Sequence, residues 1–497
     1  MSMPRNARAL SNPDTADSLP ASFATVPGEL PPGVTAKRNV LGSEAVGRLL
    51  LRFAVPAIVA TTASSFYHVI DRMIIGNGVG PLAISGLALT FPIWILAVAL
   101  GTLVGAGAGA VVSIRLGEQR LDDAVRTLGN ALVLNLLVGT SFAVLALSFL
   151  DPLLLLFGAS EQTLPYARDF MQVILSATTV THVFFGLNNI MRSSGHPMKA
   201  MGSVLLTVAV NLVLALLFVL VLGWGIRGAA WATVLSQGVG MLWVLAHFLG
   251  VGRRDGPLPE VRFRRGCFRL SWRTVGQIVA IGASPFLIHT CGSLVAILTN
   301  LQLGRHGGDL AIGAYGVIQS VLMFVVMVIF GLTQGMQPIV GFNYGARQLD
   351  RVQRALALTM LFATAVSILG VLVCQLFPWT LAQAFSSDEA FVQVVVRGMR
   401  IQSALFFAVG FQIVVSNFFQ SIGKAKVSIV LSLTRQILFL LPLLLLFPAL
   451  WGLDGVWAAT PAADLLSALV TGLMLWLHVR RGLFRTRPLG TLATAGL

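Results

Sequence analysis

Long apolar stretches follow one another along the chain, each roughly 20 residues or more and therefore long enough to cross the hydrocarbon of a bilayer. Inside a bilayer only helices and closed barrels satisfy their own backbone hydrogen-bonding groups, and runs this long indicate helices. With 56% hydrophobic and 11% charged residues among 497, a soluble core could not hide these stretches. We therefore predict an all-α polytopic membrane protein with twelve transmembrane helices. They begin near Gly47, Ala83, Asp123, Pro165, Lys199, Gly228, Arg273, Ala311, Val352, Phe391, Lys426 and Gly455.

An internal repeat divides these helices into two equal sets. A shift of 228 positions places residues 82–128 on residues 310–356 without a gap, and the match is best in a polar loop, where apolar composition cannot produce it by chance. The matched pairs include Gly107 with Gly335, Gly117 with Gly345, and Arg126 with Arg354. Six spans return the chain to the side on which it started, so the halves share one orientation and are related by an axis along the membrane normal. We predict two pseudo-symmetric lobes of six helices each.

The repeat also predicts how the chain is divided. Residues 1–42 are expected to be a flexible cytosolic tail, residues 43–251 the N-lobe, residues 252–272 an arginine-rich cytosolic linker, residues 273–480 the C-lobe, and residues 481–497 a cytosolic C-terminal tail. The first tail lacks an apolar run, so it has too little hydrophobic surface to fold by itself.

The placement of charge predicts an orientation. If Met1 is cytoplasmic, the inner segments are rich in arginine and lysine and the outer loops are poor in them. The outer exceptions are Arg168, Arg227, Arg305, Arg397 and Arg400. We therefore predict an inner-membrane protein with both termini in the cytoplasm. The formal net charge of +15 then orients helices and contacts anionic membrane lipids, and it does not indicate a nucleic-acid partner.

One carboxylate lies within the first apolar span. Tyr67 and Asp71 are four residues apart and share a helical face, whereas Arg72 points about 100° away and can extend toward the interface. Because a charged carboxylate inside a membrane costs a few kcal/mol, it must be protonated, paired or exposed to a wet cavity. Two interpretations remain open: an interfacial pair of Asp71 with Arg72, and a binding site for a cation or a proton.

Further polar residues are found in the apolar spans of both halves. In the first half, Asn188, Asn211 and Thr233 either hold helices together or line a polar pocket beside the carboxylate of the first span. Arg435 and Asp464 lie deep in their spans, where the alternative is a structural role, and Asp464 is expected to be a protonated hydrogen-bonding group. The candidates for a substrate cleft are His68, Gln319, Gln334, Gln337, Arg435 and Asp464.

The motifs that bind common cofactors are absent from the sequence. There is no G-x-x-x-x-G-K-[ST] loop, no dinucleotide glycine fingerprint and no H-E-x-x-H, so we predict no cofactor and no catalytic metal. Transport would then run on an ion gradient, and a membrane-embedded enzyme is a distant alternative. Kinks expected at Pro56, Pro92 and Pro338 favour alternating access between two lobes over a fixed channel.

Residues 335–346, with the sequence GMQPIVGFNYGA, resemble the second-half signature of multidrug and toxic compound extrusion transporters, particularly the DNA-damage-inducible F-like branch. Other segments that resemble this family are Val69-Ile70-Asp71, Asn189-Ile190-Met191-Arg192 with Gly195, residues 228–233 (GAAWAT) and residues 432–436 (SLTRQ). The resemblance covers residues 45–480. It implies two six-helix lobes arranged as a V around a central cleft, and export of organic cations or drugs in exchange for H+ or Na+.

The resemblance also implies a set of ion-coupling residues. The family's N-lobe ion site falls on Tyr67, Asp71, Asn188, Asn211 and Thr233. Four residues after the asparagine the branch usually carries a second carboxylate, where this chain has Ala215. One carboxylate makes a weaker Na+ cage than two, so H+ coupling is favoured, with Na+ at Asp71 and Asn211 as the alternative.

The sequence thus predicts a monomeric drug exporter that binds small organic cations and membrane lipids. The second candidate is a lipid-linked oligosaccharide flippase of the same superfamily, which would show a more cationic central cleft.

Overall fold

The computed structural model describes residues 40–484, except residues 81, 82, 84, 85, 88, 158, 252–260, 386 and 387. Throughout this part the chain forms helices joined by turns, without a strand. The first half contains α1 (Val40–Ser43), α2 (Val46–Gly78), α4 (Phe91–Gly117), α5 (Leu121–Ser148), α6 (Leu150–Leu156), α7 (Leu164–Ser176), α8 (Thr178–Ser193), α9 (Pro197–Ala215), η1 (Leu216–Val221) and α10 (Gly225–Leu249). The second half contains α11 (Trp272–Gly345), α12 (Leu349–Leu376), α13 (Pro378–Gln383), α14 (Glu389–Ser403), α15 (Phe407–Ser421), α16 (Ala425–Leu433), η2 (Thr434–Leu440) and α17 (Leu441–Arg480). Most of both predicted tails, and residues 252–260 of the predicted linker, lie outside the described residues.

Most helices are long and apolar enough to cross a membrane. Among the described residues nine qualify, and up to eleven do so if the bent pairs α7 with α8 and α14 with α15 each count as one span. The last of the nine, Ala425–Arg480, has 56 residues and would measure about 84 Å as one straight helix, far more than a bilayer requires. Gly452 within it has non-helical backbone angles, so a division there would give twelve spans. The count of twelve stays a prediction.

Proline positions agree only partly with the expected kinks. Pro56 lies inside α2 and Pro338 lies inside α11, where each removes a backbone hydrogen-bond donor. Pro92 does not bend its helix, because α4 begins at Phe91 and Pro92 occupies the first turn, where the missing N–H has no intrahelical partner in any case.

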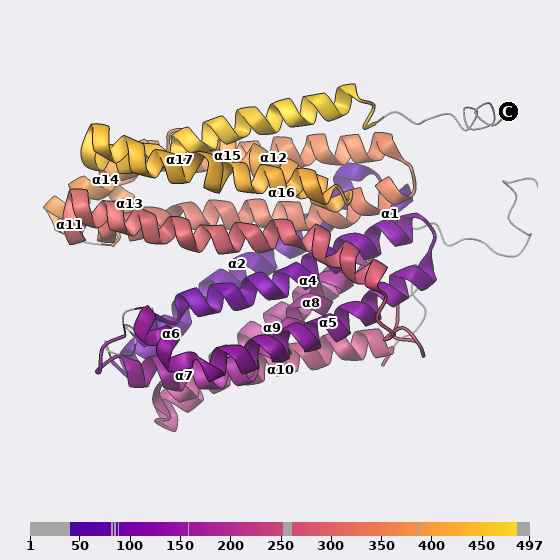
Figure 1. Cartoon of the computed structure of the whole chain (residues 1–497), viewed down its shortest axis with the longest axis horizontal. Coiled ribbons are helices and arrows are strands. Elements are labelled where there is room, and N and C mark those ends of the chain that lie inside the picture. The colour runs from indigo at the N-terminus through magenta and orange to yellow at the C-terminus, as the bar shows by residue number, and fades with distance from the viewer. Residues whose placement is uncertain are drawn as a thin grey trace, which may run out of the picture.

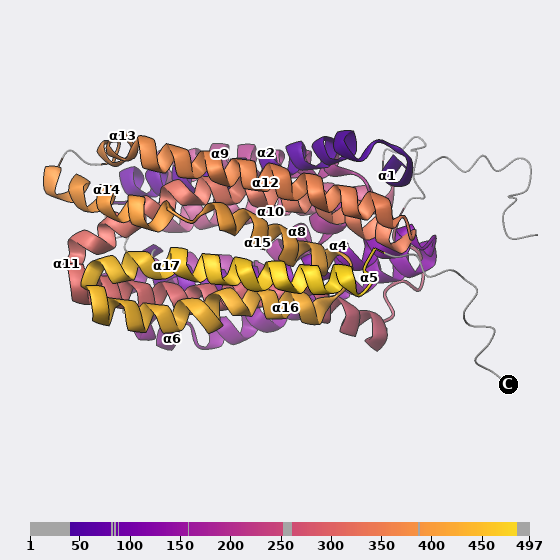
Figure 2. The same ribbon diagram turned by 90° about the horizontal axis from the view of Figure 1, so that it is seen from above.

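The helices form two bundles that correspond to the two halves of the sequence (Figure 1). Helices α5 to α10 lie in one bundle and α12 to α17 in the other, while α4 and α2 of the first half pack against α11 of the second. Seen from above in Figure 2, the long helices run nearly parallel along the long axis of the molecule. Helix α1 and the end of α17 lie at the same end of this axis, as an even number of crossings requires.

Two glycines allow the bundles to touch backbone to backbone. A Cβ atom at Gly117 would overlap the carbonyl oxygen of Phe342, and one at Gly345 would overlap that of Ile114. The shift of 228 positions exchanges these two contacts, so the repeat extends from sequence to tertiary packing. We call the contact of α4 with α11 the inter-lobe seam; its close-packed glycines are Gly107, Gly117, Gly282 and Gly345.

The same symmetry is present in the loops beside the seam. Among the described residues, Gln119 and Arg347 are the non-glycine residues with positive φ, at 61° and 58°, and the shift of 228 positions relates them too. Each follows the last turn of a seam helix and turns the chain into the next one.

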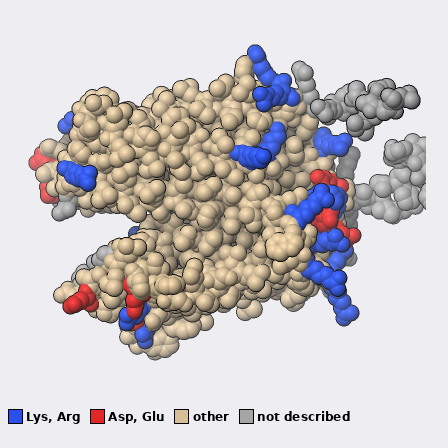
Figure 3. All heavy atoms as spheres, in the orientation of Figure 1, with Lys and Arg blue, Asp and Glu red and all other residues tan. Residues whose placement is uncertain are grey.

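The bundles separate at the opposite end. Figure 3 shows a notch between them at the end away from α1, whereas lysine and arginine side chains gather at the end where the seam closes. The molecule therefore has a cleft between its two bundles that is open at one end and closed at the basic end. We call the closed end the floor of the cleft.

Candidate ion-coupling and substrate site

Three polar side chains from separate N-lobe helices meet in a triangle. The hydroxyl groups of Tyr67 on α2 and Thr233 on α10 are 3.1 Å apart. The amide nitrogen of Asn211 on α9 donates to both, at 3.4 Å to Tyr67 and 3.3 Å to Thr233. The structure thus brings together three of the five residues that the resemblance implies, and Thr233 also donates to the Ala229 carbonyl at 3.1 Å.

Asp71 lies one helical turn beyond Tyr67 on the same face of α2. Its side chain is 8% exposed, and its Oδ1 atom is buried without a hydrogen-bond partner. Arg72 is exposed, and within the described residues the two side chains form no ion pair, so the interfacial pair is not formed in this structure. A buried carboxylate with no partner costs several kcal/mol in its charged form, which a bound proton or cation would relieve.

Asn188 does not join this cluster. Its amide nitrogen donates to the carbonyl of Ala200 at 3.0 Å and to the hydroxyl of Ser203 at 2.7 Å. Ser203 precedes Asn211 by eight residues on α9, which is about 12 Å along a helix. Asn188 therefore ties α8 to the start of α9 and contacts a different level of the lobe.

A pair of phenylalanine rings joins the two lobes on the side that faces the open end. Phe66 of α2 and Phe324 of α11 have ring centroids 5.5 Å apart, and Thr61 donates to the carbonyl of Met327 at 3.2 Å. Asp71 lies five residues beyond Phe66 toward the open end, about 7.5 Å along the helix axis. On the facing helix α11, Gln319 lies five residues from Phe324 in the same direction, so Asp71 and Gln319 are at similar depths on opposite sides.

The C-lobe carries an ion pair near this depth. Arg435 of η2 donates from Nε to Oδ1 of Asp464 on α17 at 2.6 Å, and the Asp464 side chain is 1% exposed. The two deep charged residues of the C-lobe therefore contact each other, and a protonated Asp464 stays a prediction. The amide of Gln319 donates to the Tyr315 hydroxyl, and Arg435 lies near the same hydroxyl.

Tyr315 was not predicted as a site residue. Tyr315 lies within an apolar span, one turn from Gln319, and the chain has only 4 tyrosines. The rarity of tyrosine was the one feature of the sequence that could have marked Tyr315 as a candidate site residue.

Gln337 lies in the seam and Gln334 lies beside it, where α8 meets α11; neither is on the wall of the open cleft. The Gln334 carbonyl oxygen accepts from the guanidinium of Arg192, which also donates to Asn189 at 2.9 Å. Gln337 donates to the carbonyl of Ala106 at 3.2 Å. Both contacts join the two lobes, so these residues close the floor of the cleft. The side chain of His68, another predicted cleft residue, lies outside the described residues.

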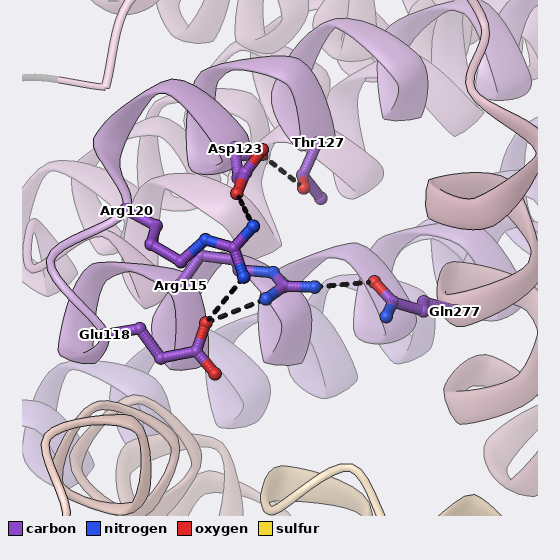
Figure 4. A network of polar contacts seen from close by, with 6 residues as sticks. All are labelled: Arg115, Glu118, Arg120, Asp123, Thr127 and Gln277. Atoms are coloured by element: carbon purple, nitrogen blue, oxygen red, sulfur yellow. Dashed lines mark hydrogen bonds and ion pairs between the residues drawn. The ribbon is translucent and has the colours of Figure 1, made fainter. Parts of the chain in front are cut away.

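A charged network closes the basic end of the seam (Figure 4). Arg115 donates to Glu118 at 2.8 Å and to Gln277 of α11 at 3.2 Å, and Arg120 pairs with Asp123 at 2.6 Å. The Arg115–Gln277 hydrogen bond joins the lobes, so lobe separation at this end would break it.

A comparison with known protein families agrees with the internal repeat of the sequence. The MatE family model matches the chain twice, over residues 56–217 and 285–446, once in each half. Among curated relatives, "Multidrug export protein MepA" of Staphylococcus aureus (strain MRSA252) is 23% identical over 436 residues, which are 87% of this chain and 94% of that protein.

Two solved structures illustrate the likeness in three dimensions. The "MATE multidrug transporter DinF-BH" is 35% identical, with a TM-score of 0.82 over 90% of this chain and 98% of that one. A structure described as the "outward-facing conformation of a multidrug resistance MATE family transporter of the MOP superfamily" has a TM-score of 0.83 at 23% identity, over 91% and 99% of the two chains, and this likeness concerns the fold.

Proposed function

The chain belongs to the multidrug and toxic compound extrusion (MatE) family, and from this premise we propose that it exports organic cations or drugs across the inner membrane in exchange for H+. Members of this family are transporters, so the chain is a multi-pass membrane transporter and not an enzyme. The finer claims, which are the coupling ion, the substrate and the transport cycle, are the proposal.

The observation that carries the proposal is the buried carboxylate of Asp71 beside the triangle of Tyr67, Asn211 and Thr233. Protonation from the outside would neutralise Asp71, and loss of the proton to the inside would restore a charge that attracts an organic cation. Ala215, on the face of α9 one turn from Asn211, is 0% exposed and supplies no oxygen ligand. The side-chain nitrogen of Asn211, which is a hydrogen-bond donor, faces the two hydroxyl groups. Because Na+ is bound by oxygen ligands, this arrangement supports proton binding over Na+ binding.

The closed floor supports alternating access. The substrate would enter the cleft from the cytoplasm only after the seam, with its Arg115–Gln277 contact, and the Arg192–Gln334 contact beside it had opened. Because each lobe is a compact bundle and the seam lies between them, opening requires the lobes to move relative to each other. One chain supplies both lobes, so we propose that a monomer is sufficient.

Charge supports a cytoplasmic location for the basic end. Of the five outer exceptions, Arg168, Arg227 and Arg397 form ion pairs with Asp151, Asp169 and Asp454 respectively. Within the described residues Arg305 and Arg400 form no ion pair. Lipids with anionic headgroups would then contact the unpaired basic residues of the inner end.

A flippase for lipid-linked oligosaccharides is the weaker candidate. At the depth of Asp71 the described charged groups are that carboxylate, the neighbouring Arg72 and the Arg435–Asp464 pair, which together carry no excess of positive charge. An anionic lipid diphosphate would require an excess of cationic groups at this depth.

The test is export of rhodamine 6G from cells and its accumulation in everted vesicles, with a pH gradient and a Na+ gradient imposed separately. We expect a pH gradient alone to drive export and a Na+ gradient alone to have little effect. Export driven only by Na+ would overturn the coupling, and no gradient-driven export of any cationic dye would overturn the proposed function.

A further inference from the structure

The ion pair between Arg435 and Asp464 is held by a single hydrogen bond. A guanidinium has five N–H donors, and Nε is the one used, at 2.6 Å from Oδ1. Among the described residues no partner is found for its terminal nitrogens. Oδ2 of Asp464 is buried without a hydrogen-bond partner. A purely structural pair would be expected to form the two parallel hydrogen bonds that arginine and a carboxylate can make.

The two partners differ in access. The Asp464 side chain is 1% exposed and the Arg435 side chain is 25% exposed. Asp464 is therefore buried inside the C-lobe, and it binds the guanidinium of Arg435 through Nε, which we call the inner edge of that group. The outer edge, with both terminal nitrogens, is the part that remains for another acceptor.

The location of Arg435 relates it to the cleft. It lies near the hydroxyl of Tyr315 on α11, and Tyr315 accepts a hydrogen bond from Gln319. Gln319 is at the depth of Asp71, beyond the point where Phe66 meets Phe324. At this depth the N-lobe therefore presents a carboxylate, and the C-lobe presents a guanidinium with unused donors.

We propose that Arg435 is a specificity residue of the C-lobe: it binds the carboxylate of substrates that carry a carboxylate beside a delocalised cation, and so favours them over simple cations. The terminal nitrogens of Arg435 bind the substrate carboxylate in the bidentate manner that suits arginine. Asp464 is a positioning residue that keeps the guanidinium in place. This inference rests on the proposed function, since it names a substrate class for the same cleft.

Charge balance supports this substrate class. The Arg435–Asp464 pair is neutral, so a simple anion would bring an uncompensated charge into a low-dielectric cleft. A zwitterion brings its own cation, which the Asp71 side of the cleft can accept. The site is thereby selective for carboxylates that belong to a molecule with a positive charge.

The test uses two dyes that differ at one group: rhodamine 19, which has a free carboxylate, and rhodamine 6G, which is its ethyl ester. Binding of each dye to the purified full-length protein is measured by fluorescence anisotropy, and export is measured in parallel. The test variant is Arg435→Gln combined with Asp464→Asn, because replacing both partners leaves no unpaired charge in the lobe. The matched control is Arg397→Gln with Asp454→Asn, which removes an exposed ion pair of the same lobe.

We expect the double variant to weaken rhodamine 19 binding at least tenfold more than rhodamine 6G binding, and Arg435→Lys to keep an intermediate preference because lysine offers a charge without the planar fork. The control should change neither dye. Equal losses for both dyes, or a wild type that binds only the ester, would overturn the carboxylate site. Rhodamine 6G export bears on the proposed function separately, so the two claims can fail independently.

Discussion

The two lobes share a backbone and differ in their polar chemistry. Where they touch, the repeat is nearly symmetric: Gly117 packs on Phe342 as Gly345 packs on Ile114. Deeper in each lobe the symmetry is lost. The shift of 228 positions pairs Asp71 with Thr299, a neutral residue.

The C-lobe charges have no counterparts either. The same shift pairs Arg435 with Thr207 and Asp464 with Ser236. The N-lobe thus has an unpaired carboxylate where the C-lobe is neutral, and the C-lobe has an ion pair where the N-lobe has hydroxyls. At the seam the two halves of the repeat pack against each other, so a change in one half must fit the other. The polar residues inside each lobe are not under this constraint and can differ between the lobes.

The largest expected effect concerns the unpaired carboxylate. Asp71→Asn should abolish gradient-driven export, down to the level of membranes without the protein, because an amide neither exchanges a proton nor carries a negative charge. Export is measured at matched membrane levels, with Asp169→Asn, in the exposed pair with Arg227, as the control. Wild-type export by the Asp71 variant would mean that the two lobes do not differ in coupling.

The seam can be tested by locking it. The backbones at Glu118 and Ala346 lie against the opposing glycines Gly345 and Gly117, and both positions have ordinary negative φ. A cysteine at each, in a protein without the three native cysteines, should form a crosslink that stops export, and reduction should restore it. Undiminished export by the crosslinked protein would exclude lobe separation at this end and favour a mechanism within one lobe.

Sodium dependence offers a smaller effect. Ala215→Asp would place a second carboxylate one turn from Asn211, and we expect export to become severalfold more sensitive to a Na+ gradient because two carboxylates form a better cation site. Ala215→Asn is the control of similar size. The measurement is export at fixed pH with Na+ varied. A wild type that already requires Na+ would contradict the premise.

The smallest effect is expected at Asn188. Since its hydrogen bonds reach Ala200 and Ser203, Asn188→Ala should lower stability by about 0.6 kcal/mol per lost bond, the average for side-chain hydrogen bonds in membranes. Thermal unfolding in detergent measures this loss. Export per folded molecule should keep its dependence on the pH gradient; a variant that folds well but loses that dependence would return Asn188 to the ion site.

The sequence by itself determined the helical class, the repeat and the family, because long apolar runs allow little besides helices and a polar loop matched at a fixed shift is not accidental. It also placed Tyr67 and Asp71 on one face, since helical spacing is a local property. Only the tertiary structure decided which helix each face meets. Spacing within α8 could not tell that Asn188 turns to Ser203, nor that Gln334 meets Arg192 beside the seam. The Arg435–Asp464 pair has the same origin: its members are 29 residues apart on separate elements, and only the packing of η2 against α17 brings a buried carboxylate to its guanidinium.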